Sequence, residues 1–565
     1  MTTVINQEPF EREDFSGGIQ RKTIKFMRKA NEVVMAVNAS FGRIGGVEKI
    51  LGMAKLGGDI SATDYTVTNL HGINFADGIT EKIHAFRGGA VVVYNPSTKV
   101  WDTVAGVSFN AAAFMDSANF LDYAFFVNGV EANYSYSSGD AWSATTNLGD
   151  DPIAKYIRNH KVRLYLGNVK INSTWYRSRV WYSDFPKNNQ ITWGLETGTD
   201  LSATSGSAVV TSAGSTFETN NIKVGNPFTI EDGNNAGEYK VRTIDSETQI
   251  TLTKTLANTE SSKTFWVGGN FFDVRTDDGD VITGFGENSN EILVFKRLSL
   301  HRYNAQAGTL RQVKNIPGTG SFRSVIDLND FTYYYEPSKS AVRRFDGSSS
   351  IIISNPIEDL LENISSSMRD KVVGWDVNER AEMFIGDTTT RDGESISNCV
   401  VVWDTITETW STRSLPFEIE AATKWIQSGK KDTYLGTSDS KVIKADSGYS
   451  YAGTAMAFEL TDQPLFPQGK DIIVNFDRIR VWIKNGHAIQ LLYKLFYMPG
   501  DGTSWGNSDW IPVRGKADAE LTEFSLSDQE LRRAAGIQIR FVQSSSEESF
   551  VLERYKIYFS NPAIE

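Results

Sequence analysis

Few residues in this chain have the type and spacing that nucleophilic, metal or phosphate chemistry requires. Cys399 is the single cysteine, which excludes an internal disulfide and any zinc site built on several cysteines. The chain has no Gly-x-x-x-x-Gly-Lys-Ser/Thr loop and no Gly-x-Ser-x-Gly turn. Five histidines are scattered without metal-ligand spacing, namely His71, His84, His160, His301 and His487. We therefore predict no catalytic, cofactor-binding or metal-binding residues.

Carboxylates are abundant, and a glycosidase would need two of them facing each other about 5–9 Å apart. The nearest match to a sialidase-type turn, residues 135–142, lacks the Asp and the Thr of that motif and does not recur, so we interpret it as a structural turn. The acidic turns at 231–235 and 277–280 do not have the spacing of a calcium-binding loop. We predict that both are solvated hairpin turns.

Short apolar runs of strand length dominate the chain, and clusters of Gly, Asn, Asp and Ser separate them. Examples are residues 90–94, 161–166, 291–295, 330–335 and 398–403. Aromatic residues make up 12% of the chain, and 47 glycines stand against 14 prolines. This combination favours an all-β fold.

An internal repeat indicates how the strands are arranged. Residues 91–103 align without a gap over residues 400–412, and both read as three valines, an aromatic residue, a turn and then Trp-x-Thr. A looser third copy at 132–145 contains Tyr134 and Trp142. Further hairpins without the Trp lie at 291–313, 330–353 and 431–446. A spacing of roughly 35–50 residues predicts a β-propeller of about six to eight blades, with a multi-sheet sandwich as the alternative.

Shifts in composition divide the chain into modules. We predict an N-terminal arm with the first strands (1–60), two propeller parts (61–196 and 269–454), a small β-barrel or sandwich inserted at 197–268, and a C-terminal β-sandwich (455–565). An insertion at an exposed loop costs little, because the entropy of loop closure grows slowly with length. Two short connecting helices are expected to start near Asn355 and Ser527.

The net charge and the hydropathy of the chain argue against two classes of protein, those that coat nucleic acid and those that span a membrane. With 57 Lys and Arg against 69 Asp and Glu, the 565-residue chain has a formal net charge of -12. A protein that coats nucleic acid needs the opposite sign. The start of the chain lacks the pattern of a signal peptide, and no stretch approaches the roughly 18 apolar residues that span a bilayer. We expect a soluble protein with no membrane segment that folds in the cytoplasm.

The layout resembles the tail nozzle (tail tubular) proteins of short-tailed DNA bacteriophages. The resemblance is carried by Asp14-Phe-Ser-Gly-Gly-Ile19, by Arg43-Ile-Gly-Gly46, by the propeller hairpins, and by an insert with the segments 224–230, 235–241 and 246–252. It covers most of the chain and is architectural, because no catalytic motif supports it. The chain is shorter than many such nozzles, so additional domains at the tip are not expected.

The resemblance implies a non-enzymatic structural protein of the virion tail, assembled in the host cytoplasm. It implies a homo-oligomeric ring, usually a hexamer, that contacts a tail adaptor ring and tail fibres or spikes. Double-stranded DNA would pass through the ring during genome ejection without specific binding, as an acidic wall allows. Two alternatives stay open: a receptor-binding or polysaccharide-degrading tail protein, and a propeller that serves as a general interaction scaffold.

Overall fold

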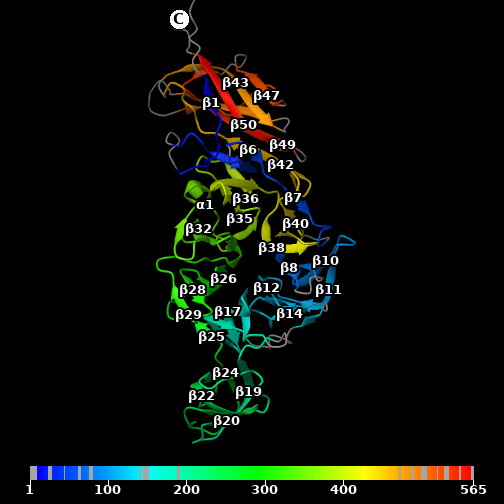
Figure 1. Cartoon of the computed structure of the whole chain (residues 1–565), viewed down its shortest axis with the longest axis vertical. Coiled ribbons are helices and arrows are strands. Elements are labelled where there is room, and N and C mark those ends of the chain that lie inside the picture. Colours follow the sequence, from blue (N-terminus) through cyan, green and yellow to red (C-terminus); the bar gives the residue numbers. More distant parts are fainter. Residues whose placement is uncertain are drawn as a thin grey trace, which may run out of the picture.

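The computed structural model describes residues 9–22, 28–43, 45–61, 65–75, 81–138, 141–143, 152–186, 191–469, 472–484, 489–497, 506–517, 519–526, 533–545 and 549–560. Three β modules follow one another along the long axis of the molecule (Figure 1). A sandwich that includes β43, β47 and β50 lies at one end, a propeller occupies the middle, and a small barrel with β19, β20, β22 and β24 lies at the other end. The all-β prediction is confirmed.

Seven four-stranded antiparallel blades form the propeller within the described residues, which confirms the predicted range of blade number. Blade 1 consists of β8 (Val67–Asn74), β9 (Glu81–Arg87), β10 (Ala90–Asn95) and β11 (Val100–Ser108). Blade 2 consists of β12 (Asp116–Phe120), β13 (Tyr123–Val127), β14 (Tyr134–Ser137) and β15 (Trp142–Ser143). Blade 3 consists of β16 (Ile153–His160), β17 (Arg163–Ile171), β18 (Thr174–Tyr182) and β25 (Phe271–Asp273). Blade 4 consists of β26 (Ile282–Asn288), β27 (Glu291–Lys296), β28 (Leu300–Asn304) and β29 (Thr309–Gln312). Blade 5 consists of β30 (Ile326–Leu328), β31 (Phe331–Glu336), β32 (Ala341–Phe345) and β33 (Ser350–Ile352). Blade 6 consists of β34 (Val373–Val377), β35 (Arg380–Thr389), β36 (Ser395–Asp404) and β37 (Thr409–Ser414). Blade 7 consists of β38 (Ile419–Gln427), β39 (Lys430–Thr437), β40 (Val442–Ala445) and β7 (Met53–Lys55).

The N-terminal part of the chain completes the last blade, because β7 pairs with β40 along the register Lys55 to Ile443. Blade 7 then contacts blade 1 through their first strands. Gly72 N donates to Thr423 Oγ1 at 3.0 Å, and Asn74 exchanges two hydrogen bonds with the backbone of Ile426 at 2.9 and 3.1 Å. The propeller is therefore a closed ring.

Gly72 sits where blades 1 and 7 approach most closely. A Cβ atom at this position would lie 2.2 Å from the carbonyl oxygen of Lys424 and 2.9 Å from the Cα of Trp425. We expect Gly72→Ala to lower the free energy of unfolding by about 1–3 kcal/mol, because the two strands must separate to admit the methyl group. The matched control is Gly58→Ala, where a Cβ meets no atom within 4 Å and a change below about 0.5 kcal/mol is expected. Urea unfolding of both variants is the measurement, and equal midpoints would contradict the expectation.

The three tryptophan hairpins share one geometry. In each, an aromatic residue on the third strand of a blade pairs with the Trp on the fourth strand: Tyr94 with Trp101, Tyr136 with Trp142, and Trp403 with Trp410. The ring centroids are 5.3, 5.2 and 5.1 Å apart. Tyr136, not the predicted Tyr134, is the partner of Trp142, because Ser135 and Tyr136 are the residues in register with β15. The repeat thus marks the outer two strands of blades 1, 2 and 6.

The insert is a closed six-stranded barrel between β18 and β25 of blade 3. Its strands are β19 (Leu195–Ala203), β20 (Val209–Thr211), β21 (Pro227–Ile230), β22 (Gly237–Ser246), β23 (Gln249–Leu252) and β24 (Glu260–Gly268). Phe228 and Phe265 stack at 5.3 Å in its core. The barrel has a core of its own and leaves the propeller at a loop, as an insertion should.

The sandwich combines strands from both ends of the chain. One sheet holds β1 (Phe10–Arg12), β5 (Ala39–Phe41), β6 (Val47–Lys49), β43 (Val474–Lys484), β47 (Leu521–Ser525), β48 (Arg533–Ala534) and β50 (Val551–Ser560). The other holds β4 (Met35–Val37), β41 (Ser450–Tyr451), β42 (Thr454–Thr461), β44 (Gln490–Tyr497), β45 (Gly506–Asn507), β46 (Ile511–Pro512) and β49 (Gly536–Ser545). A short parallel pair, β2 (Gly18–Ile19) and β3 (Glu32–Val33), lies beside them. The described residues of the predicted arm, 1–60, are thus built into the sandwich and blade 7.

The second sheet of the sandwich continues into the propeller. Strand β4 pairs with β42 of the sandwich and with β37 of blade 6, while β41 pairs with β42 and with β7 of blade 7. The result is one sheet of 15 strands. Backbone pairing therefore crosses the boundary between propeller and sandwich on two routes, at Thr412 with Val37 and at Tyr451 with Met53.

Helical structure is sparse in the described residues: η1 (Phe322–Ser324), η2 (Asn355–Ile357) and α1 (Glu358–Glu362). The helix predicted to run from Asn355 toward Met368 ends at Glu362. Asn363 and the three serines at 365–367 follow, and their side chains compete with the helix for backbone hydrogen bonds. Of the helix predicted between Ser527 and Gly536, residues 527–532 lie outside the described residues, and the rest of the prediction is wrong, because Arg533–Ala534 form strand β48. Nowhere in the described ranges is a helix both long and apolar enough to cross a bilayer.

Candidate functional site

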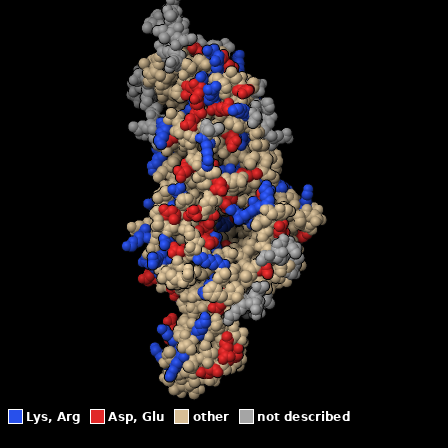
Figure 2. Space-filling view, in the orientation of Figure 1, with Lys and Arg blue, Asp and Glu red and all other residues tan. Residues whose placement is uncertain are grey.

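The first strands of the blades surround a cavity of about 410 Å³ at the centre of the propeller. All seven blades contribute to its wall, blade 5 through η1 and the residue before β30. The charged side chains among the lining residues are Asp116, Arg158, Arg323 and Lys424. Figure 2 shows the middle of the molecule hollowed over the propeller, with Lys and Arg side chains beside the hollow. Every blade thus contributes to one polar concavity at the centre of the propeller.

Side chains from one blade satisfy backbone groups of the next around this cavity. Asn119 Nδ2 donates to Gly72 O at 2.8 Å, and Asn159 Nδ2 donates to Asn119 O at 2.7 Å. Asp116 accepts from Ile157 N at 2.9 Å. The innermost strand of a blade has a free edge, whose buried polar groups would otherwise lack partners. These bonds therefore hold blades 1, 2 and 3 together.

The cations of the wall are each paired with a carboxylate. Arg158 Nη2 lies 2.5 Å from Asp327 and 3.5 Å from Glu287. Lys424 pairs with Asp376, and Arg323 lies 3.6 Å from Glu420. None of these four carboxylates lines the cavity. Asp116 is the one carboxylate among the described lining residues, and it makes no ion pair with any described cation.

His71 is held as a neutral imidazole between blades 1 and 2. Its Nδ1 lies 2.8 Å from Ser117 Oγ and its Nε2 lies 2.8 Å from Asn119 Oδ1. Because the amide nitrogen of Asn119 is used by Gly72 O, Nε2 donates to the amide oxygen and Nδ1 accepts from Ser117. Burial lowers the pKa of His71 to about 4. The imidazole therefore links two blades without carrying charge at neutral pH.

The other histidines lie apart from this one. His84 packs against the rings of Tyr136 and Trp142, His160 bonds to Glu287 at 3.0 Å, and His301 contacts Ser299 at 3.0 Å. His487 lies outside the described residues. Across the ranges that the structure describes, no group of three or more His, Cys, Asp or Glu side chains is arranged to hold a metal ion.

Burial raises the pKa of Asp116 to about 6. In the unfolded chain the carboxyl ionises near pH 4, so between about pH 4 and 6 the folded state binds more protons than the unfolded state. This group therefore lowers the free energy of unfolding as pH rises through that window. We expect the free energy of unfolding of Asp116→Asn, relative to that of the native chain, to be about 1–3 kcal/mol higher at pH 7 than at pH 4. Urea titrations at both pH values measure it, and a pH-independent difference would contradict the assignment.

The acidic turn at 277–280 is more than the predicted solvated turn. Asp278 lies 2.6 Å from the fully buried amino group of Lys296, which also donates to the carbonyls of Val274 and Arg275. Asp280 accepts from Leu298 N at 2.8 Å. Both carboxylates are therefore occupied in holding the loop before blade 4, because a buried ammonium needs a charged partner.

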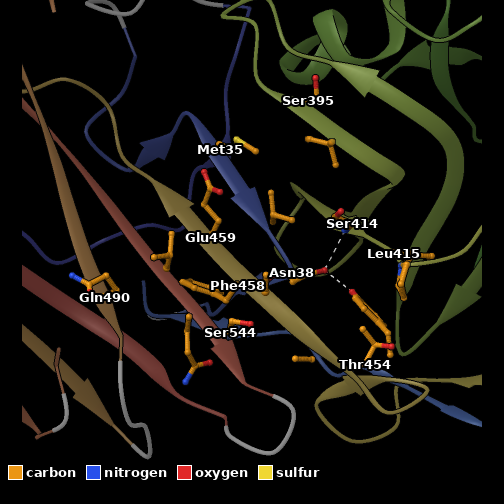
Figure 3. Close-up of a pocket in the computed structure, with 18 of the residues that line it drawn as sticks. Met35, Asn38, Ser395, Ser414, Leu415, Thr454, Phe458, Glu459, Gln490 and Ser544 are labelled. Atoms are coloured by element: carbon orange, nitrogen blue, oxygen red, sulfur yellow. Dashed lines mark hydrogen bonds between the residues drawn. The ribbon is translucent and has the colours of Figure 1, made fainter. Parts of the chain in front are cut away.

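A larger cavity of about 850 Å³ lies at the junction of blade 6 and the sandwich. Asn38, in the left-handed region with φ 55°, projects into this junction (Figure 3). Its Oδ1 accepts hydrogen bonds from the Tyr451 hydroxyl and from Ser414 N at 3.4 Å, while Nδ2 donates to Ala457 O at 2.5 Å. Burial raises the pKa of Glu459 on the same wall, where Arg540 Nε lies 3.2 Å away. The arrangement ties two modules together.

No protein-family model and no curated protein matches the sequence. Among solved structures, the computationally designed Ika8 protein aligns with 9% identity and a TM-score of 0.35, covering 69% of this chain and 99% of its own. Virginiamycin B lyase from Staphylococcus aureus aligns with 9% identity and a TM-score of 0.35, covering 68% of this chain and 96% of its own. Likeness at this level carries no argument about function.

Proposed function

We propose that the chain is a structural subunit of a bacteriophage tail, a nozzle protein that forms part of a ring-shaped conduit for genome ejection. The observation that supports the proposal is the 15-stranded sheet that fuses propeller and sandwich. A conduit wall must keep its shape under load, and a sheet that runs through both modules opposes hinging between them. The resemblance of the sequence layout to nozzle proteins supports the same reading.

The inserted barrel is the module best placed to reach a neighbouring subunit. It projects from the propeller at the end opposite the sandwich (Figure 1). The described part of the N-terminal segment is committed to intramolecular pairing with β40, β42 and β50. A ring of identical chains needs head-to-tail contacts between two different surfaces, and the barrel supplies one of them.

Mass photometry of the purified chain, alone and with its tail adaptor, tests the proposal. We expect a closed oligomer of ring size, and electron microscopy of the particles should show a central opening. A variant in which residues 198–265 are replaced by a short Gly-Ser link should remain folded but lose the ring. A chain that stays monomeric with the adaptor, and that mass spectrometry does not find in purified virions, would refute the proposal.

The charge pairing around the central cavity favours a non-enzymatic role over polysaccharide cleavage. Glycoside hydrolysis uses two carboxylates, one as acid and the other as base or nucleophile. Only Asp116 is unpaired among the described residues of the wall. An assay for reducing ends released from host polysaccharide should therefore show no turnover.

A further inference from the structure

We propose that the central cavity of the propeller binds an uncharged polyhydroxyl ligand, a single pyranose ring or a short neutral saccharide. The cavity has a volume of about 410 Å³, within the range of pockets that hold small organic ligands. Its wall combines hydrogen-bonding side chains with two phenylalanines, Phe285 and Phe322. The proposal does not depend on whether the chain assembles into a ring.

The charges of the wall oppose an anionic ligand. An anion would face the carboxylate of Asp116, and the nearby cations are already neutralised by Asp327, Glu287, Glu420 and Asp376. A ligand without net charge avoids this cost, because it gives up less hydration on entering the cavity.

Hydroxyl groups match the mixture of donors and acceptors on this wall. Each sugar hydroxyl donates one hydrogen bond and accepts others. Lys424, whose side chain is 37% exposed, and Arg158, at 32%, offer donors, since their pairing with carboxylates uses only part of their N–H groups. Asp116 offers a charged acceptor, which forms stronger hydrogen bonds than a neutral one.

Phe322 supplies apolar surface for the C–H face of a pyranose, and Phe285 closes the wall with its ring packed against Gly167. Phe322 is half-buried, and its ring is fixed edge-on to Tyr156 with the centroids 5.3 Å apart. Phe285 is buried, and Gly167 leaves the space that its ring occupies: a Cβ there would be 2.7 Å from Cζ. Both rings are therefore positioned before any ligand enters, which lowers the entropy cost of binding.

The test uses the full chain and saturation-transfer difference NMR with methyl glycosides of glucose, galactose, mannose and N-acetylglucosamine. Inorganic phosphate and tetramethylammonium are the anionic and cationic probes. We expect transfer to at least one glycoside and to neither ion. Lys424→Met should weaken that affinity at least fivefold, because it removes a donor from the wall. Lys444→Met is the matched control, since Lys444 lies on the same blade, pairs with Asp432 at 2.5 Å and does not line the cavity.

Asp116→Asn provides a second variant if Lys424→Met does not fold. It keeps the shape of the side chain, removes the charged acceptor, and should also weaken binding at least fivefold. No transfer to any glycoside, binding of phosphate alone, or an affinity unchanged in both variants would overturn the proposal. Mass photometry of the same samples reports the ring separately, so the two proposals can fail independently.

Discussion

Replacing Arg413 by Met is expected to lower the free energy of unfolding of the propeller by about 3–5 kcal/mol. The guanidinium is fully buried, with Nη2 2.9 Å from Glu382 and 3.0 Å from Asp446, and Nη1 donates to Leu51 O at 2.6 Å. These contacts join blade 6 to Asp446, directly after β40 in blade 7, and to Leu51, two residues before β7. Removing the cation leaves buried carboxylates with one partner fewer, which costs more than the lost packing.

Arg297→Met is the matched control for this variant. Arg297 pairs with Asp370 at 2.9 Å, but the two side chains are 51% and 44% exposed. Water screens such a pair, so the loss should stay below about 1 kcal/mol. Urea unfolding followed by tryptophan fluorescence compares the two, with Trp403 and Trp410 as probes close to Arg413 on blade 6. An equal loss of unfolding free energy in both variants would show that the buried ion pairs of Arg413 do not stabilise the contact between blades 6 and 7.

Deleting residues 1–55 is expected to abolish the soluble folded state. The deletion removes β7, so β40 becomes an open edge in blade 7, and it removes β1, β4, β5 and β6 from the sandwich and its junction. An unprotected sheet edge pairs with other chains, so the expected outcome is aggregation. Soluble yield and gel filtration are the measurements.

Excising the barrel, residues 198–265, is the contrasting deletion. Gly198 and Phe265 are paired, so the two ends of the excised segment are adjacent, and Leu195 and Trp266 stay in the core of blades 2 and 3. The propeller should keep its melting temperature within a few degrees. A soluble, cooperatively melting chain without residues 1–55 would show that the ring closes by another route.

The fold could be predicted from the sequence where the signal is local. The Val-Val-Val-aromatic hairpins revealed the outer strands of blades 1 and 6, and the Ser, Thr and Gly content revealed the insert. The blade number could be given only as a range, because blade 3 is interrupted by the barrel and blade 7 is completed by three residues, β7 (Met53–Lys55), from the other end of the chain. Three residues carry no periodic pattern that points to a partner so far away.

The central cavity could not be predicted at all. Its residues come from six strands and η1, and the polar ones lie on β8, β12, β16, η1 and β38, such as His71 on β8 and Asn119 on β12. The sequence does show polar side chains within otherwise apolar strands, and these include residues that line the cavity. Only the closure of the ring brings these positions together, so no spacing along the sequence relates Asp116 to Arg323 or Lys424.

The pairing of β7 with β40 has a consequence for how the protein is made. Lys55 leaves the ribosome long before its partner Ile443, a separation of 443 minus 55, or 388 residues. At about 5–20 residues per second, the first strands wait on the order of 20–80 seconds for their partners. During translation the nascent chain therefore carries an unmatched amino-terminal segment, and chaperones that shield exposed strands should bind it until synthesis is almost complete.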